Sequence, residues 1–136
     1  MTPSSLSDRG AACVLSVDDE PGVLLTRQMV LEMAGYEVLN AANGRQALAS
    51  FDAQPVDLVV LDYRMPGMDG GAVAREMKRR KPLVPVILIS AGVVDDDSQA
   101  CADCFLHKGQ GPALLLREME RLIAAMRKHP QPVAAN

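Results

Sequence analysis

The chain has 136 residues, enough for one domain that buries a core without metals or disulfides to hold it. Its formal net charge of −3 argues against a surface built for nucleic acid, because phosphate binding needs clustered lysine and arginine. The three cysteines are an odd number, and neither a signal peptide nor an apolar run of about 20 residues is predicted, so we expect a cytoplasmic protein outside the membrane.

The pattern between the two ends alternates strand and helix. Residues 1–10 and 129–136 lack apolar periodicity, and we expect them to be flexible tails around a domain spanning 11–128. The predicted elements, in chain order, are a strand at 13–17, a helix from Pro21 until Gly35, a strand at 36–41, a helix capped by Asn43, a strand at 56–61, a helix at 70–80, a strand at 84–90, a helix drawn from 95–102, a strand at 104–107 and a helix at 112–128.

Strands that are apolar throughout and separated by helices indicate the α/β class, with a five-stranded parallel sheet in a doubly wound (βα)5 arrangement. Ligands of such sheets bind outside the carboxyl ends of the strands. Four of the five strands place a charged or hydroxyl side chain at that edge, namely Asp18 and Asp19, Asp62, Ser90, and Lys108.

Three neighbouring carboxylates repel one another unless a cation keeps them ionised. A site of oxygen ligands suits Mg²⁺, which uses one or two carboxylates and leaves room for a phosphate group. Lys108 adds a positive charge, and Ser90 adds a hydroxyl group. The set predicts phosphoryl transfer with Asp62 as the nucleophile.

Four stretches in order resemble the receiver domain of two-component response regulators, over about residues 12–128. "VLSVDDEP" is similar to the first strand with its acidic pair, "DLVVLDYRMPGMDG" to the phosphoacceptor strand and loop, "VILISAG" to the hydroxyl strand, and "ADCFLHK" to the strand with an aromatic residue before a lysine. The resemblance implies a flavodoxin-like fold and a place in phosphorelay signalling.

Carried over residue by residue, the resemblance implies that Asp19 and Asp62 bind Mg²⁺ together with the backbone carbonyl of Arg64. Asp18 would act largely through water. Asp62 would take the phosphoryl group from a sensor histidine kinase or a histidine phosphotransfer protein, and Lys108 would bind its oxygens. The implied protein is a stand-alone signalling switch that catalyses only its own aspartyl phosphorylation and dephosphorylation.

The implied switch begins at Ser90, which would also bind the phosphoryl oxygens. Its movement toward them would let Phe105 turn inward and change the face made by residues 95–102, 104–107 and 112–128. A downstream protein partner would bind that face. We expect no nucleic acid or membrane partner, and a monomer or a weak homodimer.

Three departures from the family pattern affect these expectations. Gly109 follows Lys108 where the family usually has proline, so we expect a trans peptide bond and positive φ angles in the loop. Only 17 residues separate Ser90 from Lys108, so the helix within 95–102 should be short or irregular, and output should pass through helix 112–128 or helix 21–33. Arg64 and Gly92 occupy variable positions that tune the phosphoryl lifetime.

Other interpretations remain open. Cys101, Cys104 and His107 have a spacing that zinc could use, although a structural zinc site needs a fourth ligand. A hydrolase of the haloacid dehalogenase type also uses an aspartate nucleophile, but Arg64 stands where such enzymes carry their second acid. A degenerate receiver acting as a scaffold is disfavoured because all five key positions are filled.

The helix at 112–128 carries two apolar sets of residues. We interpret Leu115, Met119, Leu122 and Met126 as its core face. Leu116 and Ile123 lie a heptad apart and off that stripe, and we interpret them as a candidate dimer or partner surface.

Overall fold

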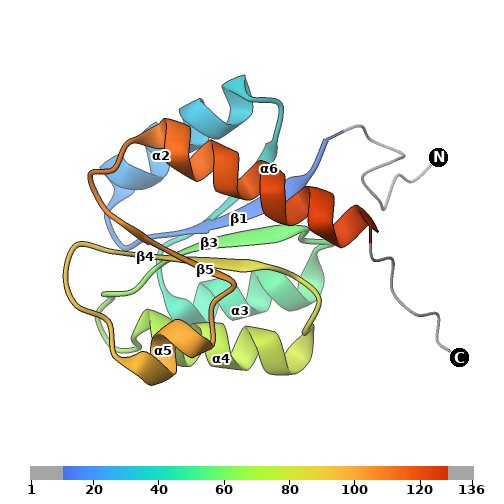
Figure 1. Cartoon of the computed structure of the whole chain (residues 1–136). Helices are drawn as coiled ribbons and strands as arrows, with labels where there is room; N and C mark the ends of the chain where they lie inside the picture. The colour runs from blue at the N-terminus through green and yellow to red at the C-terminus, as the bar shows by residue number, and fades with distance from the viewer. Residues whose placement is uncertain (1–10, 129–136) are drawn as a thin grey trace, which may run out of the picture.

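The computed structural model describes residues 11–128, and the tails predicted at 1–10 and 129–136 lie outside them. Five strands form one parallel sheet in the order β2-β1-β3-β4-β5, and helices cover both of its faces (Figure 1). The strands are β1 (Cys13–Val17), β2 (Glu37–Ala41), β3 (Leu58–Asp62), β4 (Val86–Ser90) and β5 (Cys104–His107), and the helices are α2 (Pro21–Met33), α3 (Gly44–Ala53), α4 (Gly70–Arg80), α5 (Asp96–Ala100) and α6 (Pro112–Lys128).

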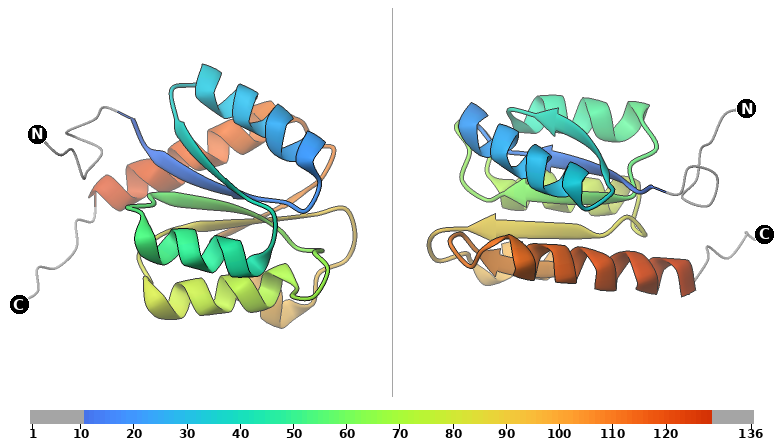
Figure 2. Two further views of the ribbon diagram at one scale, coloured as in Figure 1. Left: turned by 180° about the vertical axis from the view of Figure 1, so that it is seen from behind. Right: turned by 90° about the horizontal axis from the view of Figure 1, so that it is seen from above.

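The predicted doubly wound α/β fold is therefore confirmed. Helices α2 and α6 cover one face of the sheet, and α3, α4 and α5 lie on the other (Figures 1 and 2). Each face has its own apolar core, one including Leu31, Met119 and Ile123 and the other including Phe51 and Met77. Strands β1, β3 and β4 are buried at every position, as expected for central strands between two helical layers.

Local chemistry explains where several elements begin and end. The side chains of Asn43, Asp69 and Asp95 each accept a backbone N–H in the first turn of the helix that follows. Helix α2 begins with Pro21 and is followed by Gly35, whose φ of 98° permits the sharp turn into β2. Tyr36 was predicted in β2, but its N–H donates to the Leu31 carbonyl at the end of α2, so the strand begins one residue later.

The prediction for α6 was partly wrong. Ile123, interpreted as a surface residue, is only 6% exposed and belongs to the core with Leu115 and Met119. Residues 115, 119 and 123 are spaced by four and lie on one side of a straight helix, so this stripe faces the sheet. Leu116, Leu122 and Met126 flank it as partly buried residues.

Helix α5 has only five residues, which confirms the short helix expected between Ser90 and Lys108. Its one buried residue, Ser98, packs on the start of α4. A Cβ on Gly71 would lie 2.0 Å from the Ser98 Oγ, so this close approach requires glycine. Among residues 11–128, no helix is long and apolar enough to cross a membrane.

Candidate functional site

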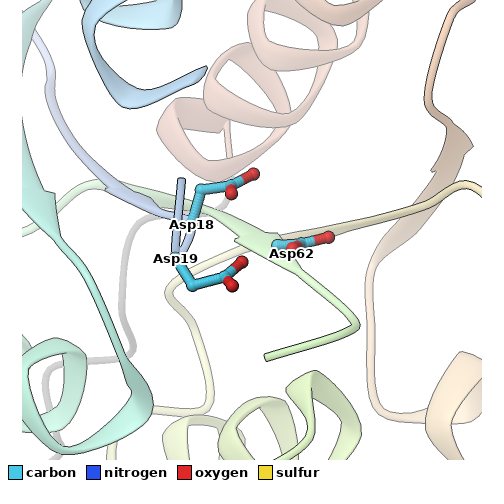
Figure 3. A group of neighbouring side chains, drawn as sticks. All are labelled: Asp18, Asp19 and Asp62. Carbon is cyan, nitrogen blue, oxygen red and sulfur yellow. The ribbon is translucent and has the colours of Figure 1, made fainter. Parts of the chain in front are cut away.

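Three aspartates meet at the carboxyl ends of β1 and β3. Asp18 and Asp19 directly follow β1, and Asp62 is the last residue of the neighbouring strand β3. One oxygen from each carboxylate lies within 4.8 Å of the others, and the three side chains extend beyond the strand ends in the same direction (Figure 3). Asp18 and Asp62 are buried, whereas Asp19 is exposed. The structure thus brings together the acids that were predicted to share this edge.

Lys108 supplies positive charge to the two buried acids. Its Nζ lies 3.4 Å from Asp62 Oδ1 and 3.6 Å from Asp18 Oδ2. The backbone N–H of Lys108 donates to the Ser90 carbonyl at 2.9 Å, which holds the lysine beside the end of β4. The peptide bond to Gly109 is trans, and Gly109 has a φ of 91°, as expected from the glycine that replaces the usual proline.

The pKa of Asp62 is raised from its ordinary value. Burial is the largest cause, and the neighbouring Asp18 carboxylate adds to it. The charge and hydrogen bond of Lys108, with a backbone hydrogen bond from Arg64, act in the opposite direction without cancelling the effect. The cluster therefore favours the arrival of further positive charge.

A buried oxygen of Asp18 indicates where an additional cation would lie. Asp18 Oδ1 accepts the Glu20 N–H at 3.0 Å, but Asp18 Oδ2 has no hydrogen-bond partner among the described residues and meets only cations at 3.6 Å. A buried carboxylate oxygen without a hydrogen bond is costly. Because Mg²⁺ binds carboxylate oxygens and keeps several water ligands, the donor set and this oxygen fit a hydrated Mg²⁺.

Ser90 ends β4 and is fully buried. Its Oγ accepts the Gly92 N–H at 3.1 Å and lies 3.3 Å from the Gly92 carbonyl, to which it can donate. The hydroxyl is therefore engaged with its own loop. Phe105, in the neighbouring strand β5, is half-buried and packs against the core on the α3 and α4 face.

Sequence reasoning missed one residue of the site, Arg27 on α2. Its side chain is 9% exposed, its Nη1 donates to Ser16 Oγ at 3.1 Å, and its Nη2 lies 3.6 Å from Asp18 Oδ2. Burial lowers the pKa of Arg27, and the charges of Asp18 and Asp62 raise it. A signal was available, because Arg27 occupies the helical stripe that also holds Leu24 and Leu31.

The cysteines and the histidine considered for zinc are not brought together. Across residues 11–128, the aspartate cluster is the only group of three or more His, Cys, Asp or Glu side chains close enough to share a metal ion. The Cys104 thiol donates to Glu118 Oε1 at 3.6 Å, and the His107 and Phe105 rings pack in a T-shaped arrangement with 5.0 Å between ring centroids.

Comparisons with known proteins agree with this geometry. The family described as "Response regulator receiver domain" matches residues 14–120. The response regulator SaeR of Staphylococcus aureus (strain USA300) is 33% identical over 125 residues, which cover 88% of this chain and 54% of SaeR. The regulator PhoP of Bacillus subtilis is 35% identical over 78 residues, covering 57% of this chain and 32% of PhoP. The chain thus spans about half or less of the length of these curated relatives.

Solved structures give the same result. A CheY-like receiver domain protein from Methanospirillum hungatei JF-1 superposes with a TM-score of 0.84 at 25% identity, covering 88% of this chain and 99% of that one. The response regulator TrrA of Thermotoga maritima, solved in complex with Mg²⁺ and BeF, gives a TM-score of 0.78 at 34% identity, covering 82% of this chain and 98% of TrrA.

Proposed function

The chain belongs to the response regulator receiver family of two-component signalling proteins, and from this membership we propose that Asp62 is the residue that accepts a phosphoryl group. Receiver domains of response regulators receive phosphoryl groups from histidine kinases. The observation that carries the proposal is the position of buried Asp62, which shares a cluster with two other aspartates and lies 3.4 Å from the Lys108 ammonium.

The proposed transfer needs little beyond positioning and neutralisation of charge. A carboxylate oxygen of Asp62 attacks the phosphorus of a phosphohistidine on the donor protein. The O–P bond forms as the P–N bond breaks, and the imidazole nitrogen keeps the electron pair of that bond. Lys108 is already close enough to Asp62 to bind an arriving phosphoryl oxygen, and we assign Ser90 a hydrogen bond to a second one.

We assign the proposed metal site to the same cluster. Asp19 and Asp62 would bind Mg²⁺ with the backbone carbonyl of Arg64, and Asp18 would hold a water ligand through Oδ2, the oxygen that lacks a hydrogen bond. When bound, Mg²⁺ supplies positive charge that offsets the charge of the phosphoryl oxygens. A cation at this position would favour the ionised form of Asp62, whose pKa is raised by burial and by the Asp18 carboxylate.

We propose that the phosphodonor docks at a groove beside the site. The groove has a volume of about 1040 Å³ and lies between the first turns of α2 and the loop from β5 to α6, with Lys108 in its lining. Helix α2 also exposes Leu25, Met29 and Met33, at 59%, 57% and 88% of their surface. These apolar side chains suit a helical surface on a histidine kinase or a histidine phosphotransfer protein.

The switch is proposed to start at the Ser90 hydroxyl. Binding a phosphoryl oxygen would turn it away from Gly92 and change the packing beside Phe105. Differential stabilisation of about 5.5 kcal/mol turns a mostly off state into a mostly on one, and two or three charge-assisted contacts supply that order of energy. Because α5 has only five residues, we propose that α6 or α2 carries the output to a downstream protein partner. A partner whose binding is lost only on substitutions within 95–102 would contradict that choice.

The protein is a signalling protein, and we propose that its catalysis is limited to its own phosphorylation and dephosphorylation. Arg64 stands two residues after Asp62, where a hydrolase of the dehalogenase type carries its general acid, so turnover of other substrates is not expected. A cytoplasmic location and a monomeric or weakly dimeric state stay predictions.

Intact mass after incubation with acetyl phosphate tests the proposal. We expect a gain of one phosphoryl group that requires Mg²⁺, is lost in Asp62→Asn and is kept in Asp52→Asn, a matched change at an exposed acid paired with Arg80. If no gain appears, the same comparison is made with a histidine-phosphorylated donor protein. Failure with both donors would make the chain a binding module that works without phosphorylation.

A further inference from the structure

A buried arginine lies on the inner face of α2, where the helix packs on the sheet. Leu24, Arg27 and Leu31 share this face, and their exposed fractions are 8%, 9% and 0%. The two leucines are apolar and need no polar partner there, but a guanidinium at such a position must be hydrogen-bonded and paired with an opposite charge. Because arginine stays protonated in proteins, the positive charge is permanent.

Two contacts hold this charge in place, one to strand β1 and one to the residue that follows it. Nη1 donates to Ser16 Oγ at 3.1 Å, and Ser16 lies within β1 and is fully buried. Nη2 lies 3.6 Å from Asp18 Oδ2, the buried oxygen that lacks a hydrogen bond. The guanidinium is thus fixed beside the acid cluster by one hydrogen bond and one ion pair, both to residues at the end of β1.

Arg27 changes the charge that the cluster offers to a metal ion. With three ionised carboxylates and Lys108 alone, the group would carry two net negative charges, and the guanidinium of Arg27 leaves one. Both cations lie 3.6 Å from the same oxygen of Asp18. A divalent ion entering the cluster must therefore share Asp18 with two resident cations, and like charges at such distances repel.

We propose that Arg27 is a positioning residue that holds the Asp18 carboxylate in the absence of metal and, by the same contact, weakens the binding of Mg²⁺ to the cluster. This inference rests on the proposed function only in taking the aspartate cluster as the Mg²⁺ site. Its consequence is a receiver whose acids are kept in place by an internal cation. Such a site needs a higher concentration of free Mg²⁺ to fill than the same cluster would need without the charge of Arg27.

Isothermal titration calorimetry with MgCl₂ on the full chain tests the proposal without phosphorylation. Arg27→Gln removes the charge, Arg27→Lys keeps it, and Arg127→Gln removes an exposed charge at the far end of α6 (Figure 1). We expect Arg27→Gln to bind Mg²⁺ about tenfold more tightly than the native chain, the order expected for one unit charge near a divalent ion across a hydrated path. Arg27→Lys and Arg127→Gln should stay within about twofold of native.

Thermal unfolding at increasing MgCl₂ gives a second readout, because a ligand that binds only the folded state raises the midpoint. The midpoint of Arg27→Gln should begin to rise at a lower Mg²⁺ concentration than that of the native chain. If Arg27→Gln shows no cooperative unfolding, Arg27→Leu takes its place, since leucine suits the stripe of Leu24 and Leu31. Unchanged or weaker Mg²⁺ affinity in the folded neutral variant would overturn the proposal.

The metal site itself is checked with Asp19→Asn. If the native chain binds Mg²⁺ and this variant loses it, the proposed site stands, and the Arg27 variants then decide the inference alone. If the native chain shows no Mg²⁺ binding but Arg27→Gln does, both the proposed metal site and the inference about Arg27 are supported. If neither chain binds Mg²⁺, both are overturned.

Discussion

A methyl group added at Gly70 would collide with the backbone that carries the proposed phosphoacceptor. A Cβ at Gly70 lies 2.5 Å from the carbonyl oxygen of Asp62 and 2.6 Å from the Cα of Tyr63, whereas ordinary contacts begin at 3.4 Å. Backbone atoms cannot rotate away as side chains do, so the start of α4 and the end of β3 must separate by about 1 Å. That movement also strains the hydrogen bond from the Gly70 N–H to the Tyr63 carbonyl.

We therefore expect Gly70→Ala to lower the free energy of unfolding by about 1.5 to 4.5 kcal/mol. Overpacking accounts for about 1 to 3 kcal/mol and the weakened hydrogen bond for about 0.5 to 1.5 kcal/mol. The matched control is Gly22→Ala, because Gly22 lies in α2 and a Cβ there meets nothing within 4 Å. Gly22→Ala should stabilise the fold by about 0.4 to 1 kcal/mol.

Urea unfolding followed by circular dichroism measures both variants, since the chain has no tryptophan. Gly70→Ala should also slow phosphorylation by acetyl phosphate, because displacement of about 1 Å at a reacting group can cost about a hundredfold in rate. A Gly70→Ala chain as stable as Gly22→Ala, or one phosphorylated at the native rate, would show that this backbone gives way easily and would refute the steric argument.

Three further predictions concern substitutions of single residues. The pKa of Asp62 is raised above the ordinary aspartate value of 3.8, so the folded state holds the Asp62 proton more tightly than the unfolded state does. As the pH rises above 3.8, the carboxylate ionises and the folded state loses stability relative to the unfolded state. Asp62→Asn should thus be more stable than native at neutral pH, with the difference shrinking toward pH 3 in parallel thermal scans; equal midpoints at neutral pH would contradict this. Asn43 accepts the Gln46 N–H at 2.8 Å, so Asn43→Ala should cost about 1 kcal/mol in urea unfolding, and Asn43→Ser much less. Gly109 has a φ of 91°, and a methyl group there would meet nothing within 4 Å, so Gly109→Ala should cost about 1 kcal/mol in the same assay from backbone strain alone, while Gly109→Asn should cost less.

The location of the site at one edge of the sheet could be predicted from the sequence alone. The apolar runs of β1, β3 and β4 are long enough for central strands, and parallel pairing brings their carboxyl ends to one edge. Asp18, Asp62 and Ser90 therefore had to lie near one another. The glycine after Lys108 and the short interval before it likewise predicted the trans loop and the short α5, and both are present.

Other features depended on how the elements pack. The apolar spacing in α6 suggested Leu122 and Met126 as core, yet Ile123 faces the sheet. Ser90 was expected to offer its hydroxyl to a phosphoryl group, and only the loop conformation shows it bonded to Gly92. The Gly71 and Ser98 contact between α4 and α5 has no signature in either segment.

Arg27 illustrates the difference most clearly. Its place on an apolar stripe is visible in the chain, but its partners Ser16 and Asp18 lie on another element and are reached only when α2 settles on the sheet. Periodicity records which side of a helix or strand prefers to be buried. It carries no information about where on the sheet a helix is placed, and that placement decides which buried groups meet.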